Sequence, residues 1–263
     1  MNGALLGTLS LATLAAAFEG LRRWAIRLNN FSIVDAGWTY GFLLVAGLAA
    51  SLECGWARRR CAVFLIVAAW SLRLGTHLAR RIAAHHPRED SRYAELRRNW
   101  GPNFRRRMAG FFQLQAASVV IFSLPFFLSC RDVTPRWHVS EWLGLVIWLA
   151  GWLGESAADR QLARFKSDPT HRGQVCDAGL WSLSRHPNYF FEFVVWIGFA
   201  AFASSAPWGW LGVISPLCIL GLLLRVTGIP MAEQQSLRSK GDAYRQYQRR
   251  TRAFVPWPKR RRP

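Results

Sequence analysis

The sequence predicts an all-α fold, a polytopic integral membrane bundle of about seven transmembrane helices. We expect a single domain over residues 1–263. Half of the chain is apolar, and the apolar residues gather in long runs that alternate with blocks of arginine. The formal net charge of +19 therefore marks the faces of a membrane protein. A nucleic-acid-binding domain would gather its arginines on one soluble surface, so we expect the lipid bilayer as partner and no nucleic acid.

Seven apolar runs are candidate membrane spans. In chain order they cover residues 5–18, 31–54, 62–79, 110–128, 141–158, 187–203 and 208–229. Positive charge follows the first run, at Arg22, Arg23 and Arg27, whereas a secretory signal carries its charge in front. We therefore expect a transmembrane helix there, although the short run also fits a helix lying in the membrane interface.

Lysine and arginine are concentrated after the first, third and fifth predicted spans and in the tail. The positive-inside rule assigns these segments to the cytoplasm. The N-terminus is then outside and the C-terminus cytoplasmic, and we expect the inner membrane of a bacterium as the location. Arg58, Arg59 and Arg60 are the exception, because this topology places them outside.

Cysteine and histidine spacings predict no metal site. The five cysteines include no C-x-x-C pair, and the six histidines include no H-E-x-x-H. We interpret the cysteines as reduced packing residues without a disulfide framework. No G-x-G-x-x-G follows a strand pattern, so a Rossmann domain is excluded and a nucleotide would have to bind among helices.

Ionisable side chains inside apolar runs are costly and mark functional sites. Asp35 and Tyr40 stand near the start of the second span, where they face a cavity or, alternatively, Asp35 caps the helix. Arg73 lies well inside the third span and needs an anionic partner, either a carboxylate such as Asp35 or Glu192 or a bound phosphate. A structural ion pair explains Arg73 nearly as well.

Two polar segments are predicted to fold on the cytoplasmic side. Residues 80–107 are long enough for a helical hairpin, and the basic, aromatic tail over residues 231–263 is expected to pack back on this face. The fifth span continues in a helical stripe of Glu155, Asp159 and Lys166, which offers acceptors and then a cation. A solvated amphipathic helix end is the alternative.

The stretch over residues 179–196 combines charged and polar groups with a long apolar run. Pro187 has no N–H to lose, so it predicts the first turn of a helix. Asn188 and Glu192 then lie four residues apart on one face, and Glu192 enters the membrane-spanning run, where a carboxylate is a functional candidate. The alternative is that Arg185, His186 and Glu192 belong to a snorkelling, solvated helix end.

The motif G-(x)5-R-H-P-N-Y-x-x-E of this stretch, the stripe at Asp159 and the aromatic tail resemble the steroid 5-alpha-reductase superfamily, in its bacterial branch of uncharacterised membrane proteins. Isoprenylcysteine carboxyl methyltransferase relatives share the motif. The resemblance covers most of the chain and is strongest over residues 155–256. In the reductases the cytosolic ends of the later helices enclose NADPH, so the resemblance implies a cofactor half at about residues 142–258.

The resemblance also implies roles for single residues. Asp159 and Lys166 fall where the adenosine-phosphate part of NADPH is held, and Asn188 and Glu192 match the asparagine and glutamate of the cofactor helix. The implied cofactor-binding residues are Arg73, Glu155, Asp159, Arg164, Lys166, Arg185, His186, Asn188, Tyr189, Glu192, Trp196, Tyr244 and Tyr247.

The activity implied is an NADPH-dependent reduction of an activated C=C bond, an enone in a sterol-like or isoprenoid lipid, by a monomer. The reductases' Gln–Glu pair is absent and Trp70 replaces their third-helix tyrosine, so Asp35 or Tyr40 is the expected catalytic acid. The alternative is an S-adenosylmethionine-dependent membrane methyltransferase, which Glu233 favours although Gln234 replaces that group's second glutamate. A non-catalytic scaffold is a third interpretation.

Overall fold

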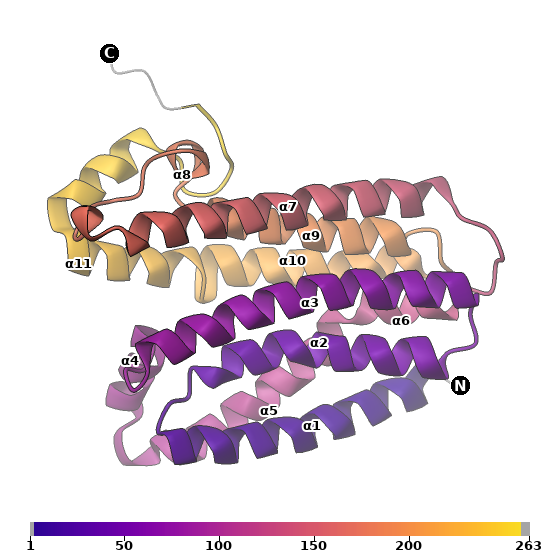
Figure 1. Cartoon of the computed structure of the whole chain (residues 1–263). Coiled ribbons are helices and arrows are strands. Elements are labelled where there is room, and N and C mark those ends of the chain that lie inside the picture. The colour runs from indigo at the N-terminus through magenta and orange to yellow at the C-terminus, as the bar shows by residue number, and fades with distance from the viewer. Residues whose placement is uncertain (1–2, 259–263) are drawn as a thin grey trace. The chain divides into compact units, whose positions relative to one another are not determined.

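The computed structural model describes residues 3–258, and this part of the chain contains no strand. With 81% of the residues in helices, the all-α prediction is confirmed. The helices form two compact units, residues 1–137 with 203–215 and residues 138–202 with 216–263, and each is described by itself (Figure 1).

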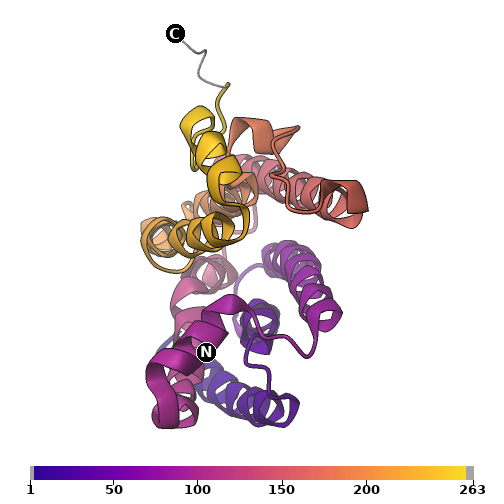
Figure 2. The same ribbon diagram turned by 90° about the vertical axis from the view of Figure 1, so that its left-hand side faces the viewer.

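The first unit begins with three long helices, which Figure 2 shows nearly end-on. Its helices are α1 (Gly3–Leu28), α2 (Ile33–Leu52), α3 (Ala57–His85), α4 (Ser91–Trp100), α5 (Phe104–Phe122) and α6 (Leu124–Arg131), with the 3₁₀ turns η1 (Gly101–Asn103) and η3 (Gly209–Val213).

Helix α2 is central to the first unit, because it packs against α1, α3, α5 and α6. Gly41 of α2 faces Leu14 of α1 and Val119 of α5. On the α3 side, a Cβ at Gly75 would lie 2.6 Å from the ring of Tyr40. Tyr40 therefore packs closely against α3, where a glycine leaves room for its ring.

Several predicted boundaries in this unit need correction. Helix α3 begins at Ala57 rather than at residue 62 and continues to His85, so the predicted hairpin comprises the end of α3, α4 and the start of α5. The fourth predicted span is two helices, because α5 ends at Phe122 and Pro125 lies in the first turn of α6. Proline has no N–H to donate and its ring displaces the preceding turn, so one continuous helix is disfavoured.

The N-cap of α2 is Ser32, and Asp35 lies in the first turn of the helix. The predicted alternative that Asp35 caps this helix is therefore wrong. Its carboxylate stays available for contacts with other elements.

Arg59 gives the arginine block at the start of α3 a structural role. Its side chain is 1% exposed and lies 3.4 Å from the carboxylate of Asp132. Its guanidinium donates to the backbone carbonyls of Asp132, Thr134 and Arg136 over 2.9, 3.1 and 2.7 Å. Arg59 is thus a buried, paired charge that holds the segment after α6. Of the three arginines that conflict with the predicted orientation, Arg59 is therefore a buried structural residue and not a solvent-exposed loop charge.

The second unit is built around two long helices and the polar tail helix. Its elements are α7 (Val139–Ser167), the 3₁₀ turn η2 (Pro169–His171), α8 (Leu180–Leu183), α9 (Pro187–Ala203), most of α10 (Ile214–Gly221), the π-helical turn η4 (Leu222–Val226) and α11 (Ile229–Arg250). The predicted helix start at Pro187 is confirmed. The seventh predicted span is divided into η3, α10 and η4, so it is not one regular helix.

Helices α7 and α9 approach each other closely because glycines lie at their interface. A Cβ at Gly151 would lie 2.6 Å from the backbone nitrogen of Val195. Seven residues earlier on α7, a Cβ at Gly144 would overlap the backbone of Phe202. From Gly144 to Gly151 the residue numbers rise along α7, while those of the facing residues fall from Phe202 to Val195 along α9, so the two helices are antiparallel. Small residues at such interfaces are common between membrane helices, since they let the backbones touch.

Among residues 3–258, five helices can cross a membrane by length and composition, which marks the chain as an integral membrane protein. They are α1, α2, α3, the segment Ser91–Arg131 that contains α5 and α6, and the segment Gly209–Arg250 that contains α10. Helix α9 is apolar but shorter, and α7 is not among the five. Five of the seven predicted spans therefore have a matching helix of this kind.

We expect Gly151→Ala to destabilise the protein by about 1–3 kcal/mol, because the new methyl group forces α7 away from α9. Thermal unfolding of the purified protein in detergent measures this effect. The control is Gly7→Ala, where nothing lies within 4 Å of the added Cβ. That change should be neutral or stabilise by roughly 0.5–1 kcal/mol. Equal effects at the two positions would contradict the close approach of α7 and α9.

Candidate functional site

Two polar side chains meet where α7 and α9 run side by side. The side-chain amide of Asn188 donates to the carboxylate of Asp159 over 3.3 Å. Asp159 is buried near the end of α7, and Asn188 is half-buried at the start of α9. The antiparallel packing brings these ends together. Two residues that the sequence assigns to one cofactor are thus in direct contact.

Buried carboxylates lie next to this pair. Glu192, one turn further along α9, is 7% exposed and accepts a hydrogen bond from the indole of Trp196 over 2.9 Å. Glu155, one turn before Asp159 on α7, is 3% exposed. The antiparallel register of α7 and α9 places Glu155 and Glu192 at a similar height along the paired helices. The alternative of a solvated helix end does not hold for Glu192, because its carboxylate is buried and hydrogen-bonded.

A second cluster links the segment before α9 to α11. The Nε of Arg185 donates to Glu233 over 2.5 Å. Its Nη1 donates to the backbone carbonyls of Gln248 and Thr251 over 3.1 and 2.6 Å. The Nε2 of His186 lies 3.4 Å from the same oxygen of Glu233. The tail therefore packs back onto the chain as predicted. The hydrogen-bond partners of Arg185 described here are groups of the tail.

Glu233 lies in the polar part of the chain after the last apolar run, where charged residues recur. Burial acts to raise its pKa, but the hydrogen bonds from His186 and Arg185 outweigh burial and lower the pKa to about 2. Burial, followed by the charge of Glu233, raises the pKa of Tyr244 to about 12. Burial likewise raises the pKa of Tyr247. At neutral pH the cluster combines an ionised carboxylate with two protonated tyrosines.

Tyr247 fastens the segment that precedes α9. Its hydroxyl donates to the backbone carbonyl of Trp181 and lies 3.2 Å from that of Ser184. The Ser184 hydroxyl donates to the carbonyl of Phe254 over 2.7 Å, and the indole of Trp181 donates to that of Ala158 over 3.0 Å. In this structure Tyr247 ties the tail to the segment before α9, and that segment is tied in turn to α7.

The remaining second-unit candidates lie on α7 and at the start of α9. The rings of Tyr189 and His186 stack with centroids 5.4 Å apart. Arg164 and Lys166 are exposed at the end of α7. At 1.5 Å per residue, Lys166 lies roughly 10 Å along the helix from Asp159. One helix therefore carries a buried acceptor and exposed cations beyond it.

In the first unit, Asp35 joins a hydrogen-bonded group with two residues of α4. Its carboxylate accepts from the hydroxyl of Tyr93 and from Nη2 of Arg92, each over 2.6 Å. The hydroxyl of Tyr40 lies 3.2 Å from that of Thr76. The two predicted catalytic acids thus have different surroundings, and the carboxylate of Asp35 has an O–H group in contact with it.

The predicted residues are distributed over both units. Arg73 is half-buried in the middle of α3 and, like Asp35 and Tyr40, belongs to the first unit. All other predicted site residues belong to the second unit. There the structure brings together Asp159 with Asn188, Glu192 with Trp196, and Arg185 with His186.

Sequence reasoning missed several partners of these residues. Arg92 and Tyr93 received no role, although they stand 57 and 58 residues from Asp35 and contact it. The sequence indicates Glu233 only through the methyltransferase alternative, and no pattern in the tail marks Gln248. The aromatic and polar composition of the tail was the available signal, but composition does not specify which residue pairs with which.

Within residues 3–258, no group of three or more histidine, cysteine, aspartate and glutamate side chains is placed to hold a metal ion. The five cysteines are free thiols. The polar groups described above are therefore the chemistry that this part of the chain offers to a ligand.

A family model described as "Protein of unknown function (DUF1295)" matches residues 23–251, and the chain belongs to this family. The family is associated with steroid 5-alpha-reductase-like membrane proteins, which supports the resemblance at that level. No curated protein and no solved structure matches the chain.

The low pKa of Glu233 predicts a pH-dependent attachment of α11. Because its pKa of about 2 lies below the ordinary value of 4.5, the carboxylate stabilises the folded state above pH 4.5, and this contribution is lost as the pH falls towards 2. We expect the melting temperature of the wild type to fall more steeply over this window than that of Glu233→Gln. Thermal unfolding at stepped pH measures the difference.

The matched control is Asp242→Asn on the same helix, whose side chain is 84% exposed. Its pH profile should follow the wild type, because an exposed ion pair contributes little to stability. Parallel profiles for Glu233→Gln and the wild type would show that Glu233 does not stabilise this attachment.

Proposed function

We propose that this member of the DUF1295 family is a membrane-embedded, NADPH-dependent reductase of an activated C=C bond, an enone in a sterol-like or isoprenoid lipid. The observation that carries the proposal is the contact between Asp159 and Asn188, with the buried Glu192 one turn away. Helix α7 also ends in the exposed cations Arg164 and Lys166. The association of the family with reductase-like membrane proteins supports the same class.

The groups present fit a nicotinamide dinucleotide chemically. Carboxylates accept hydrogen bonds from ribose hydroxyls, an amide pairs with a carboxamide, and cations pair with phosphates. Helix α7 carries the cation Lys166 roughly 10 Å along the helix from Asp159, the residue that contacts Asn188. When bound, NADPH would supply the hydride, and the protein supplies binding, orientation and electrostatics.

The contacts among these side chains separate binding residues from positioning residues. Asp159 accepts one N–H of Asn188, which leaves the amide oxygen and the second N–H of Asn188 for a ligand. Trp196 donates to one oxygen of Glu192 and so fixes that carboxylate. We infer that Asn188 and Glu192 contact the cofactor while Asp159 and Trp196 orient them.

The cluster around Arg185 supports the same site from the segment that precedes α9. It ties the residues immediately before Pro187 to α11 through Glu233. Asn188 follows directly on this anchored segment, so its position depends on the cluster. We assign Arg185 and Glu233 to positioning rather than to direct contact with the reacting atoms.

Reduction of an enone also needs a proton donor and a group that polarises the carbonyl. Asp35 and Tyr40 remain the proposed acids, both in the first unit. Asp35 accepts hydrogen bonds from the Tyr93 hydroxyl and from Arg92, so these two groups orient its carboxylate. The proposed substrate is a hydrophobic lipid that enters from the bilayer, and the enzyme acts as a monomer.

The alternative is a membrane methyltransferase that uses S-adenosylmethionine. The contact of Arg185 and His186 with Glu233 favours it, because these residues resemble that group as well. Gln234 stands where the group carries a second glutamate, which argues against it. The choice of cofactor separates the two activities.

The reductase proposal predicts that NADPH raises the melting temperature of the purified protein and that Glu192→Ala weakens this binding. Removing a buried acceptor leaves its partners unpaired, which costs about 1–3 kcal/mol and lowers the affinity about tenfold. A titration of NADPH against the melting temperature measures the change. Asp242→Ala, which removes an exposed carboxylate, is the control and should bind like the wild type. A response to S-adenosylmethionine but not to NADPH would favour the methyltransferase.

Lys166→Ala should weaken NADPH far more than NADH, because a cation on the adenosine phosphate acts only when that phosphate is present. Competition of both nucleotides for the same site measures the ratio. Arg160→Ala removes another exposed cation of α7 and serves as the control. An equal loss for both nucleotides in Lys166→Ala would show that Lys166 does not contact that phosphate.

We also propose that α7 and α9 cross the membrane in addition to the five apolar helices, with the N-terminus outside and the C-terminus in the cytoplasm of a bacterial inner-membrane protein. The glycine contacts between α7 and α9 support this, since such packing is typical of membrane helices. A reporter active only in the cytoplasm should be inactive when fused after Trp137 and active after Gly173. The opposite pattern would reverse the orientation.

A further inference from the structure

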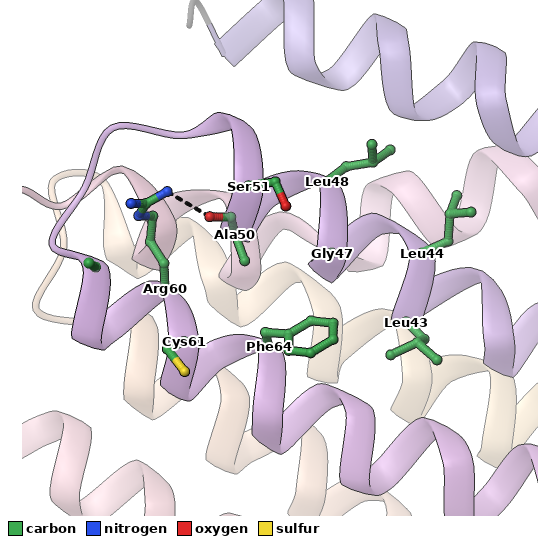
Figure 3. Close-up of a pocket in the computed structure, with 10 residues that line it drawn as sticks. Leu43, Leu44, Gly47, Leu48, Ala50, Ser51, Arg60, Cys61 and Phe64 are labelled. Atoms are coloured by element: carbon green, nitrogen blue, oxygen red, sulfur yellow. Dashed lines mark hydrogen bonds between the residues drawn. The ribbon is translucent and has the colours of Figure 1, made fainter.

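A groove of about 520 Å³ lies between the second half of α2 and the start of α3 in the first unit (Figure 3). Its lining is mainly apolar, with Leu44 and Leu48 on α2 and Phe64 on α3. Gly47 contributes no side chain, which leaves the groove open beside Phe64. Leu44 is 39% exposed, so the groove opens on the surface of the protein.

One end of the groove is polar and cationic. Arg60 and Ser51 line it there, and Nη1 of Arg60 donates to the backbone carbonyl of Ala50 over 2.6 Å (Figure 3). The Nε of Arg60 is buried and has no hydrogen-bond partner among the described residues. A buried donor without a partner is costly, so this end of the groove favours a ligand that accepts a hydrogen bond from Arg60.

The neighbouring charges leave this end positive. Glu53 is buried and lies 3.7 Å from Nε of Arg131, and Arg59 is paired with Asp132. Arg58 is exposed next to them. Arg58 and Arg60 form no ion pair within residues 3–258, so an anion at the groove end would meet two uncompensated cations.

We propose that this groove binds an anionic phospholipid of the membrane, with an acyl chain along Leu44, Leu48 and Phe64 and the phosphate at Arg60. The apolar walls match a hydrocarbon chain, and the arginine matches a phosphate through charge-assisted hydrogen bonds. A neutral apolar ligand would leave the Nε of Arg60 without a partner. The lipid site is independent of the proposed reductase activity, because none of the residues that line the groove is among those assigned to that activity.

Bound lipid also accounts for the position of the arginine block. Arg58 and Arg60 lie at the membrane end that the positive-inside rule assigns to the outside, where free cations are not expected. Phosphate headgroups are present in both leaflets. An arginine that binds a lipid phosphate is stabilised on either side of the membrane, so its position does not have to follow the positive-inside rule.

The test is native mass spectrometry of the full-length protein, purified in detergent and titrated with phosphatidylglycerol or phosphatidylcholine of the same chains. We expect preferential retention of phosphatidylglycerol and a loss of affinity of about tenfold in Arg60→Gln. Arg58→Gln removes an equal charge outside the groove and should change the affinity by less than about twofold. Arg60→Lys, which keeps the charge, should retain part of the binding.

A second variant tests the apolar part without touching the charge. A Cβ at Gly47 meets only Phe64, at an ordinary 3.7 Å, so Gly47→Leu fills the groove while the helix contacts stay in place. It should also lose phosphatidylglycerol. Inorganic phosphate and glycerol 3-phosphate, which lack the chain, should not compete at millimolar concentration.

Four outcomes would overturn the proposal. Equal losses in Arg60→Gln and Arg58→Gln would indicate general attraction to a charged surface. Unchanged binding in Gly47→Leu would show that no chain lies in the groove. Equal retention of both lipids by the wild type, or competition by inorganic phosphate, would remove the anionic lipid as the ligand. If Arg60→Gln does not fold, Gly47→Leu decides by itself, because it leaves Arg60 intact.

Discussion

The backbone contact between α7 and α9 is the constraint on which the second unit depends. Gly144 and Gly151 present no side chain to α9, so the two helices settle at backbone distance and in one register. This register determines that Asp159 meets Asn188 and that the carboxylates of neighbouring turns are buried. A polar site inside apolar helices is stable only when its members satisfy one another, and the close approach makes that possible.

The start of α9 is held from two sides. The glycine interface fixes it against α7, while Arg185 and Tyr247 fasten the preceding residues to the tail and to Trp181. Such support matters because a binding group is effective only if its orientation is fixed before the ligand arrives. The tail, which lies far along the chain from α7, is therefore part of the architecture of the proposed cofactor site.

Arginine has two different physical roles in this protein. Arg59 is buried and pairs with a carboxylate and three carbonyls, so it stabilises a chain segment. Arg185 does the same for the tail. Arg60 caps the end of α2 but keeps a buried donor at an apolar groove, which is the basis of the proposed lipid site. A count of positive charges by segment therefore describes the membrane faces only approximately, because buried arginines serve the fold.

The sequence alone determined the helical class, five of the seven apolar spans and the helix start at Pro187, since these follow from local hydropathy and backbone chemistry. It also selected Glu192, because a carboxylate in an apolar run is costly, and Asn188, because it lies four residues earlier on the same helix face. Only the tertiary structure decided the pairings, such as Asp35 with Tyr93 or Arg185 with Glu233, 58 and 48 residues apart. Such contacts depend on how whole helices pack, and no local pattern encodes the register in which two distant helices meet.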